Sequence, residues 1–252
     1  MGDGPGKRPP LEDGCLYMTA ERKYYQSGLS FIKRSLREKE YHQGPYGPCV
    51  PRLSKERLQN EAECLRFIRS NTNVPVPAVY ADFEDDVAYY LVTEFIQGVD
   101  LNDIPLEKKD LVRAEVEKHL HTLHNLRSKT VGGPSGLLIP PRSVMESTKH
   151  DLWVLQPSGK EEEYAFCHND LSEYNVIVNP ETFKIAAIID WEHAGFYPEY
   201  FEAPIYTRHG PDAKLINDKN HVARLLEFLR SRSVDTTVPE FEEKKIEQNK
   251  AN

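Results

Sequence analysis

Apolar residues in the first part of the chain follow two spacings, which predict strands and one helix. Strands are expected over 30–33, 78–83 and 87–96, where apolar side chains alternate with polar ones or form short runs. The acidic run at 84–86 marks the last two strands as a hairpin. Residues 55–70 carry apolar side chains three or four positions apart, which is the period of a helix. This part of the chain therefore predicts a small sheet with one helix.

The second part has longer helical patterns that are interrupted by one hairpin. Helical spacing covers 106–126 and again 221–231. Between them, apolar runs at 176–178 and 183–189 flank the turn-forming sequence at 179–182. Polar residues crowd the loops on both sides of this hairpin. The order of elements predicts an α+β fold with a cleft.

The same patterns divide the chain into two lobes with loose ends. We expect a flexible tail over 1–14, a β-rich N-lobe over 15–97 and a mainly helical C-lobe over 98–240. The charged residues 241–252 are expected to form a second tail. Residues 127–163 are weakly patterned and rich in Gly, Pro, Ser and Lys, and loops of this length are usually functional or flexible.

Composition and charge exclude several classes of function. The 252 residues carry a formal net charge of −8, so the basic surface of a nucleic-acid-binding protein is not expected. No stretch approaches the run of about 20 apolar residues that a membrane helix needs, and the first residues hold no signal-type apolar segment. The 4 cysteines form no C-x-x-C pair, which suggests a reducing compartment. We therefore expect a cytoplasmic protein without a nucleic acid or membrane partner.

The most informative motif is the polar run at 168–175, which reads His-Asn-Asp-Leu-Ser-Glu-Tyr-Asn. It contains Asp170 and Asn175, and the second strand after it delivers Asp190 to its C-terminal end. Mg²⁺ prefers hard oxygen ligands, which Asp190 and Asn175 can supply. Phosphoryl transfer from ATP also needs a group that orients the attacking hydroxyl and accepts its proton, and Asp170 suits this role.

This combination resembles the aminoglycoside phosphotransferase and choline kinase family, and especially its fungal members. The resemblance rests on the run that begins at His168 and on Ile-Ile-Asp-Trp-Glu-His-Ala-Gly-Phe-Tyr-Pro from Ile188. It implies a two-lobed, protein-kinase-like fold, ATP and Mg²⁺ as cofactors, and a hydroxyl of a small molecule as acceptor. It also implies that Asp170 is the catalytic base, and that Asn175 and Asp190 bind the metal.

The resemblance extends upstream to a Lys and a Glu. Lys33 ends an apolar strand, where the family has a Lys that contacts the α- and β-phosphates. Glu61, on the following helix, corresponds to the acidic partner of that Lys, and Glu63 is the alternative on another helix face. The Val-Pro-Val-Pro run at 74–77 follows in the expected order.

Residues 91–98 resemble the hinge that joins the two lobes of kinases. The resemblance places Thr93 at the back of the adenine pocket. It also pairs the backbone carbonyl of Glu94 and the backbone N–H of Ile96 with the edge of the adenine. The alternative interpretation is a plain buried strand that ends at Gly98.

Two departures from the family pattern bear on activity. Ahead of Lys33, only Ser27-Gly28 lies where the Gly-rich phosphate loop is expected, and the first strand of the N-lobe is expected to be short or missing. The Gly residues at 2, 4 and 6 fall in the predicted tail. Few residues follow Asp190, so substrate recognition is expected to be reduced or unusual.

These features leave a small-molecule kinase as the first hypothesis and two alternatives beside it. A catalytically silent, kinase-like binding module is favoured by the weak Gly loop and opposed by the intact set of predicted site residues. A protein kinase is opposed by the Asp-Trp-Glu sequence at 190–192. His168 is expected to brace its loop, whereas Glu192 either supports the site or forms a surface salt bridge. The acceptor and the oligomeric state cannot be read from the sequence.

Overall fold

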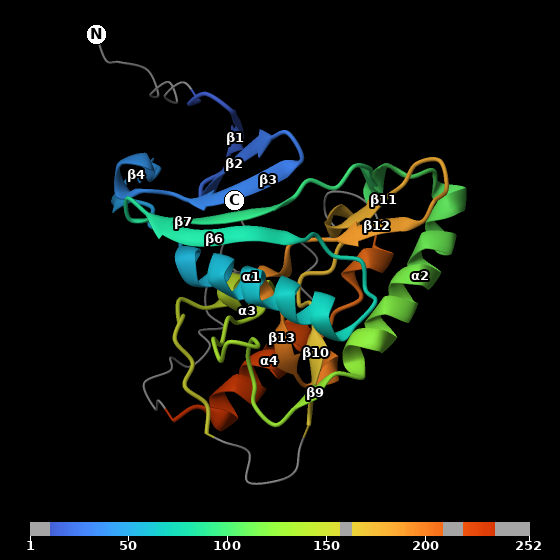
Figure 1. The fold of residues 1–252 in the computed structure, drawn as a ribbon. Coiled ribbons are helices and arrows are strands. Elements are labelled where there is room, and N and C mark those ends of the chain that lie inside the picture. The colour runs from blue at the N-terminus through green and yellow to red at the C-terminus, as the bar shows by residue number, and fades with distance from the viewer. Residues whose placement is uncertain (1–10, 157–162, 209–218, 235–252) are drawn as a thin grey trace, which may run out of the picture.

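The structure is a computed structural model that describes residues 11–156, 163–208 and 219–234 (Figure 1). The predicted tail at 241–252 and the Gly residues at 2, 4 and 6 lie outside the described residues. No helix within these three stretches is both long and apolar enough to cross a membrane.

An antiparallel sheet forms the upper part of the molecule in Figure 1. Its strands, in spatial order, are β1 (Cys15–Met18), β2 (Arg22–Ser27), β3 (Ser30–Ser35), β7 (Ala88–Glu94) and β6 (Val79–Asp85). β6 and β7 pair as the hairpin expected from the sequence. Lys33 in β3 lies opposite Tyr24 of β2 and Leu91 of β7, so its backbone is central in the sheet.

At the start of this sheet, β1 is short, as expected, with 4 residues, whereas β2 was not predicted from the sequence. β1 and β2 are both present, and each pairs with its neighbour along the chain. β1 has no buried residue, and β2 directs Arg22 rather than an aliphatic side chain into the interior, so neither strand shows a strong apolar pattern. Gly28 lies in the turn between β2 and β3, with a φ of +57° that favours glycine. The turn between β1 and β2, at 19–21, has no glycine.

Helix α1 (Ser54–Asn71) lies under the sheet and joins it to the rest of the molecule (Figure 1). Leu58 and Ala62 pack against Leu91 of β7. Further along the same helix, Leu65 belongs to the large apolar core of the lower part. The buried positions of α1 lie three or four residues apart along one side of the helix, and their first members contact the sheet while the later ones join the lower core.

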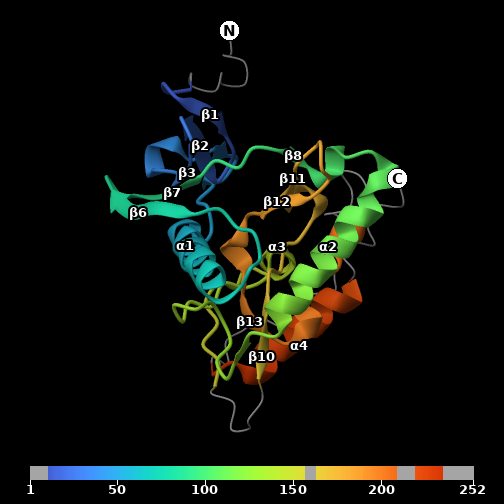
Figure 2. The same ribbon diagram turned by 45° about the vertical axis from the view of Figure 1, so that its right-hand side comes forward.

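The lower part combines helices with short sheets (Figure 2). The helices are α2 (Leu106–His124), α3 (Arg142–Ser147) and α4 (Lys219–Arg232). One sheet has the order β12 (Ile185–Ile188), β11 (Val176–Val178) and β8 (Val99–Asp100). The other has the order β13 (Gly195–Tyr197), β10 (Tyr164–Cys167) and β9 (Arg127–Ser128). A separate small hairpin pairs β4 (Gln43–Gly44) with β5 (Gly47–Pro48).

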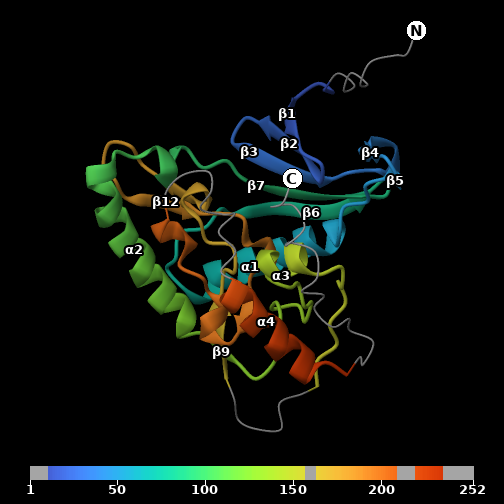
Figure 3. The same cartoon turned by 180° about the vertical axis from the view of Figure 1, so that it is seen from behind.

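The core of the lower part fixes the β11–β12 hairpin. Val116 and Leu123 of α2 are fully buried in one cluster with Val176 of β11 and Ile188 of β12. A second cluster joins α3 to α4, which lie together on the far side of the molecule (Figure 3). Because the hairpin is anchored from below, the polar loops at its two ends are held in a fixed relation.

The passage from the sheet to the lower part requires glycine at position 98. Gly98 has a φ of +158°, and an added Cβ would lie 2.6 Å from Cγ2 of Ile177 and 2.7 Å from the carbonyl oxygen of Val178. This close approach seats the connecting chain on β11.

Candidate active site

Three segments that are distant in sequence bring Lys33, Glu61 and Asp190 together. Nζ of Lys33 lies 2.7 Å from Oε1 of Glu61 and 2.8 Å from Oδ1 of Asp190. The strand β3 provides the Lys, α1 provides the Glu, and the loop after β12 provides the Asp. Glu61, and not Glu63, therefore contacts the Lys, because Glu63 faces outward and pairs with Arg66.

The electrostatics of this cluster keep Lys33 and Asp190 charged. Burial alone would lower the pKa of Lys33, but Asp190 and Glu61 raise it above its ordinary value. Burial would raise the pKa of Asp190, but the Lys33 ammonium holds it far below its usual range. Asp190 is therefore a carboxylate at any ordinary pH.

The polar run 168–175 follows β10 and is tied to the Asp190 loop by hydrogen bonds. Nε2 of His168 lies 2.9 Å from the carbonyl oxygen of Ile189, and the backbone N–H of Ile189 donates to the carbonyl oxygen of Asn175 at 3.0 Å. Burial lowers the pKa of His168 to about 4, so its ring is neutral near pH 7. These contacts agree with the expected bracing role of His168.

The side chain of Asn175 has its nitrogen already engaged. Nδ2 of Asn175 donates to the carbonyl oxygen of Asp170 at 2.7 Å. The amide oxygen is the remaining group of this side chain, and it is the atom type that Mg²⁺ prefers. Asp170 itself is buried, with Oδ2 at 3.7 Å from Nη1 of Arg142 in α3.

Glu202 supports the same loop from behind and was not predicted from the sequence. Its carboxylate accepts the backbone N–H groups of His168 and Asn169. Burial raises the pKa of Glu202 to about 7, although these two hydrogen bonds oppose the shift. A Glu beyond the last motif, after a short turn, carries no pattern that would have indicated this contact.

Glu192 lies inside the protein and not in a surface salt bridge. Its carboxylate pairs with Arg22 of β2 and Arg57 of α1, and all three side chains are buried. Burial opposes ionisation, but Arg22 holds the pKa of Glu192 down at about 2. Asn60 adds a hydrogen bond of 3.1 Å from Nδ2 to the backbone carbonyl oxygen of Glu192. The sequence predicted neither arginine, because the residue type alone does not distinguish a buried Arg from an exposed one.

The expected hinge residues lie at the end of β7. Thr93 is buried, and its hydroxyl lies 3.5 Å from the carbonyl oxygen of Phe31. Glu94 and Ile96 follow, where the chain leaves the sheet, and the backbone N–H of Phe95 donates to the carbonyl oxygen of Leu29 at 2.8 Å. The structure thus places all three residues beside the start of β3.

Aromatic side chains that the sequence reading did not single out lie near Lys33. The rings of Tyr17 and Tyr24 stack with centroids 4.4 Å apart, and Tyr24 lies 6.0 Å from Phe31. Tyr24 opposes Lys33 across the β2–β3 pair, and Phe31 is two residues before Lys33. Opposed residues, and residues two apart in a strand, share a face of the sheet, so this face offers flat apolar surface beside the ammonium.

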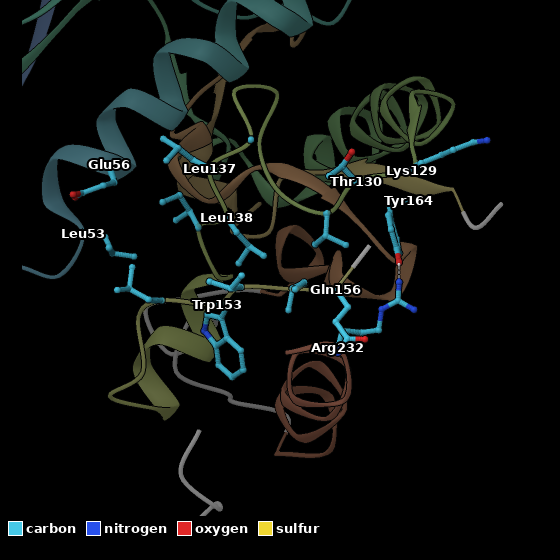
Figure 4. A pocket seen from close by; sticks show the side chains of 16 residues that line it. Leu53, Glu56, Lys129, Thr130, Leu137, Leu138, Trp153, Gln156, Tyr164 and Arg232 are labelled. Atoms are coloured by element: carbon cyan, nitrogen blue, oxygen red, sulfur yellow. Dashed lines mark hydrogen bonds between the residues drawn. The ribbon is translucent and has the colours of Figure 1, made fainter. Parts of the chain in front are cut away.

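A separate cavity of about 690 Å³ lies elsewhere in the lower part (Figure 4). Apolar side chains such as Leu137, Leu138 and Trp153 line it, and Arg232 donates to the hydroxyl of Tyr164 at its edge at 2.8 Å. None of the predicted site residues lines this cavity.

Comparison with known proteins connects the second half of the chain to phosphotransferases. Residues 140–232 match the phosphotransferase enzyme family. The chain is 24% identical over 194 residues to an aminoglycoside 3'-phosphotransferase of Streptomyces fradiae, and 27% identical over 165 residues to one of Streptomyces ribosidificus. These alignments cover 64% and 57% of this chain, and 68% and 62% of the two relatives.

Solved structures extend the likeness to nearly the whole chain. An aminoglycoside-3'-phosphotransferase of type VIII matches with a TM-score of 0.50 and 18% identity, covering 89% of this chain and 90% of that one. The aminoglycoside phosphotransferase APH(4)-Ia matches with a TM-score of 0.51 and 15% identity, covering 85% and 81%. The chain therefore has the α+β, kinase-like fold predicted from its motifs. The narrower resemblance to choline kinases and fungal members stays a prediction.

Proposed function

We propose that this protein is an ATP- and Mg²⁺-dependent phosphotransferase that acts on a hydroxyl of a small molecule. The observation that carries the proposal is the ion cluster of Lys33, Glu61 and Asp190, which three separate segments assemble. The similarity of residues 140–232 to phosphotransferases supports it. So does the fold shared with an APH(3'')-Id structure from Streptomyces rimosus in complex with ADP and streptomycin, at a TM-score of 0.50 and 14% identity.

In this proposal the cluster binds the phosphates of ATP. Glu61 holds the Lys33 ammonium in place, so that it can donate to the α- and β-phosphates. The carboxylate of Asp190 and the amide oxygen of Asn175 suit Mg²⁺, because both are hard oxygen donors. The metal would neutralise charge on the phosphates. Thr93, Glu94 and Ile96 would border the adenine, with the aromatic face of β1–β3 against the base.

Asp170 is the group that we assign to the acceptor. Its carboxylate would accept a hydrogen bond from the acceptor hydroxyl and take the proton as the phosphoryl group is transferred. The hydrogen bonds from Asn175 and His168 hold the backbone of this loop, so the carboxylate is positioned before substrate arrives. Positioning and charge neutralisation then account for most of the rate enhancement.

The acceptor itself is proposed only as a class. The matched relatives are named for aminoglycosides, which are hydroxyl-rich small molecules. Within one fold, acceptor contacts vary from loop to loop, so cholines, sugars and amino alcohols stay within the proposal. We place the protein in the cytoplasm, without a nucleic acid or membrane partner.

The turn between β1 and β2 favours a second candidate, the catalytically silent binding module. Residues 19–21 read Thr-Ala-Glu and hold no glycine to approach the phosphates closely. We rank it second, because the Lys33 cluster and the braced Asp170 loop are both present.

Titration calorimetry with Mg·ATP tests the proposal directly. Wild-type protein should bind in the presence of Mg²⁺ and lose affinity when EDTA is added. Asp190→Asn should weaken metal-dependent binding, whereas the matched outward-facing variant Glu63→Gln should not. Failure of the wild type to bind would reject the phosphotransferase. Binding without release of ADP across a panel of aminoglycosides, sugars and amino alcohols would favour the silent module.

A further inference from the structure

Arg142 occupies a fixed place next to the proposed catalytic base. It is the first residue of α3, in the weakly patterned segment 127–163. The backbone just before it is anchored twice: the carbonyl oxygen of Pro140 lies 2.8 Å from Nδ1 of His193, and that of Ile139 accepts the hydroxyl of Tyr197 at 2.6 Å. His193 belongs to the loop that carries Asp190, so α3 is tied to that loop.

The guanidinium of Arg142 has donors that are still available. Its Nε donates to Oε1 of Glu146 at 2.8 Å, and its Nη1 lies 3.7 Å from Oδ2 of Asp170, beyond hydrogen-bond length. Neither Nη group makes a hydrogen bond to any residue that the structure describes. The Arg142 side chain is 45% exposed, whereas the Asp170 side chain beside it is 5% exposed.

Arg142 differs in this from the other cations of the site. Lys33 is shared between two carboxylates, and Arg22 and Arg57 are sealed around Glu192. Burial opposes the charge on Arg142, but three carboxylates, Asp170 and Asp190 among them, raise its pKa above the ordinary value. Of these carboxylates, Asp170 is the proposed catalytic base, and its Oδ2 lies 3.7 Å from Nη1 of Arg142.

We propose that Arg142 is a further catalytic residue, which binds oxygens of the γ-phosphoryl group from the acceptor side. The inference rests on the proposed function. An acceptor hydroxyl within about 3 Å of Asp170 would have the γ-phosphorus about 3–3.5 Å beyond it. Nη1 of Arg142 lies 3.7 Å from Oδ2 of Asp170, so a γ-phosphoryl group on the same side of Asp170 would lie within reach of the paired Nη donors.

Arg142 neither donates nor accepts a proton in the proposed transfer step. A lone pair on the acceptor oxygen forms the new bond to the γ-phosphorus, and the bond from that phosphorus to the β–γ bridging oxygen breaks. The electron pair of the broken bond stays on ADP, and the acceptor proton passes to the Asp170 carboxylate. Arg142 keeps its own protons throughout and offsets charge on the transferring group.

The test compares two nucleotides that differ in the γ-phosphoryl group. Calorimetry would measure the affinity of Mg·ADP and of Mg·AMP-PNP for wild type, Arg142→Gln and Arg142→Lys. Arg142→Gln should weaken Mg·AMP-PNP by about tenfold to a hundredfold and leave Mg·ADP within about twofold, because it loses charge-assisted hydrogen bonds to one phosphoryl group. Arg142→Lys, which keeps the charge but loses the fork, should fall between.

Arg66→Gln is the matched control, since Arg66 is 43% exposed and pairs with Glu63 and Asp82 on the outer side of α1. It should leave both affinities unchanged. Equal affinities of wild type and Arg142→Gln for Mg·AMP-PNP would overturn the inference. The remaining role for the guanidinium would then be to bind an anionic group of the acceptor. Parallel losses for both nucleotides, in both Arg142 variants, would overturn it in favour of a structural role. No binding of Mg·ADP by the wild type would instead reject the proposed function.

Discussion

Two buried ion clusters lie side by side where the sheet, α1 and the loop after β12 meet, and they are built differently. In the first, Lys33 joins Glu61 and Asp190, and the Asp190 side chain is 26% exposed. In the second, Arg22 and Arg57 enclose Glu192, whose side chain is only 5% exposed. Both clusters lie between the same three parts of the fold, but only the first has a partly exposed carboxylate at its centre; in the second, Arg57 also pairs with Glu21 at the surface.

The difference separates a binding function from a structural one. A cation with an exposed partner can exchange that partner for a ligand at small cost. A buried carboxylate that pairs with two buried arginines cannot exchange them for a ligand, because breaking these ion pairs would leave buried charges without a partner. We infer that the Glu192 cluster fixes the position of the loop and that the Asp190 cluster uses this position to bind nucleotide.

The largest expected effect comes from breaking the sealed cluster. Glu192→Gln leaves Arg22 buried without a carboxylate and leaves Arg57 with only the half-exposed Glu21, which should lower the free energy of unfolding by about 3–5 kcal/mol. Urea unfolding followed by circular dichroism measures the change. A loss below about 1 kcal/mol would show that the arginines find other partners, and would contradict the structural role.

Asp190→Asn should have a large effect on activity and a small effect on stability. It removes the charge that faces the proposed metal, so phosphoryl transfer or ATP hydrolysis should fall by about a hundredfold to a thousandfold. The free energy of unfolding should change by less than about 1 kcal/mol, because Lys33 keeps Glu61 as partner. Coupled assay of ADP release and urea unfolding on the same preparation separate the two effects. Full retention of turnover would remove Asp190 from the metal site.

The sealed cluster should also produce a pH dependence of stability through His193. Burial lowers the pKa of this ring to about 4 from an ordinary value of 6.5, although Glu192 nearby opposes the shift. Below pH 6.5 the unfolded chain binds a proton that the folded protein refuses, so stability is lost as the pH falls from 6.5 to about 4. The contribution is at most about 3 kcal/mol.

His193→Gln can still donate to the carbonyl oxygen of Pro140, but it does not titrate. The difference in unfolding free energy between wild type and this variant should therefore shift in favour of the variant between pH 7 and pH 5. A difference that does not change with pH would show that His193 is protonated in the folded protein as readily as in the unfolded one.

The smallest effect sharpens the choice between two neighbouring acids on α1. Glu61→Gln weakens the hold on Lys33 and should reduce the affinity for Mg·ATP by about tenfold, because it leaves a hydrogen bond in place of a charged pair. Glu63→Gln alters only an exposed pair and should change affinity by less than about twofold. Equal losses in the two variants would argue against an ordered Lys33–Glu61 pair.

Much of the fold was predictable because the relevant signals are local. The β6–β7 hairpin, α1, α2, α4 and the β11–β12 hairpin follow from apolar periodicity and turn residues. β2 was missed, because Arg22 fills an interior position that periodicity assigns to an aliphatic side chain. In the site, motif spacing indicated Asp170, Asn175 and Asp190 as candidates, and the resemblance to a family of phosphotransferases indicated Lys33 and Glu61.

The sequence by itself determined which residues of this protein are candidates for the site, because motif spacing is set by the strand and loop geometry around it. The tertiary structure decided which charges meet. The pairing of Arg22 and Arg57 with Glu192, the support of the Asp170 loop by Glu202, and the approach of Arg142 to Asp170 all join distant parts of the chain. Such contacts depend on packing of the whole core, and side-chain charge alone does not distinguish a buried partner from a solvated one.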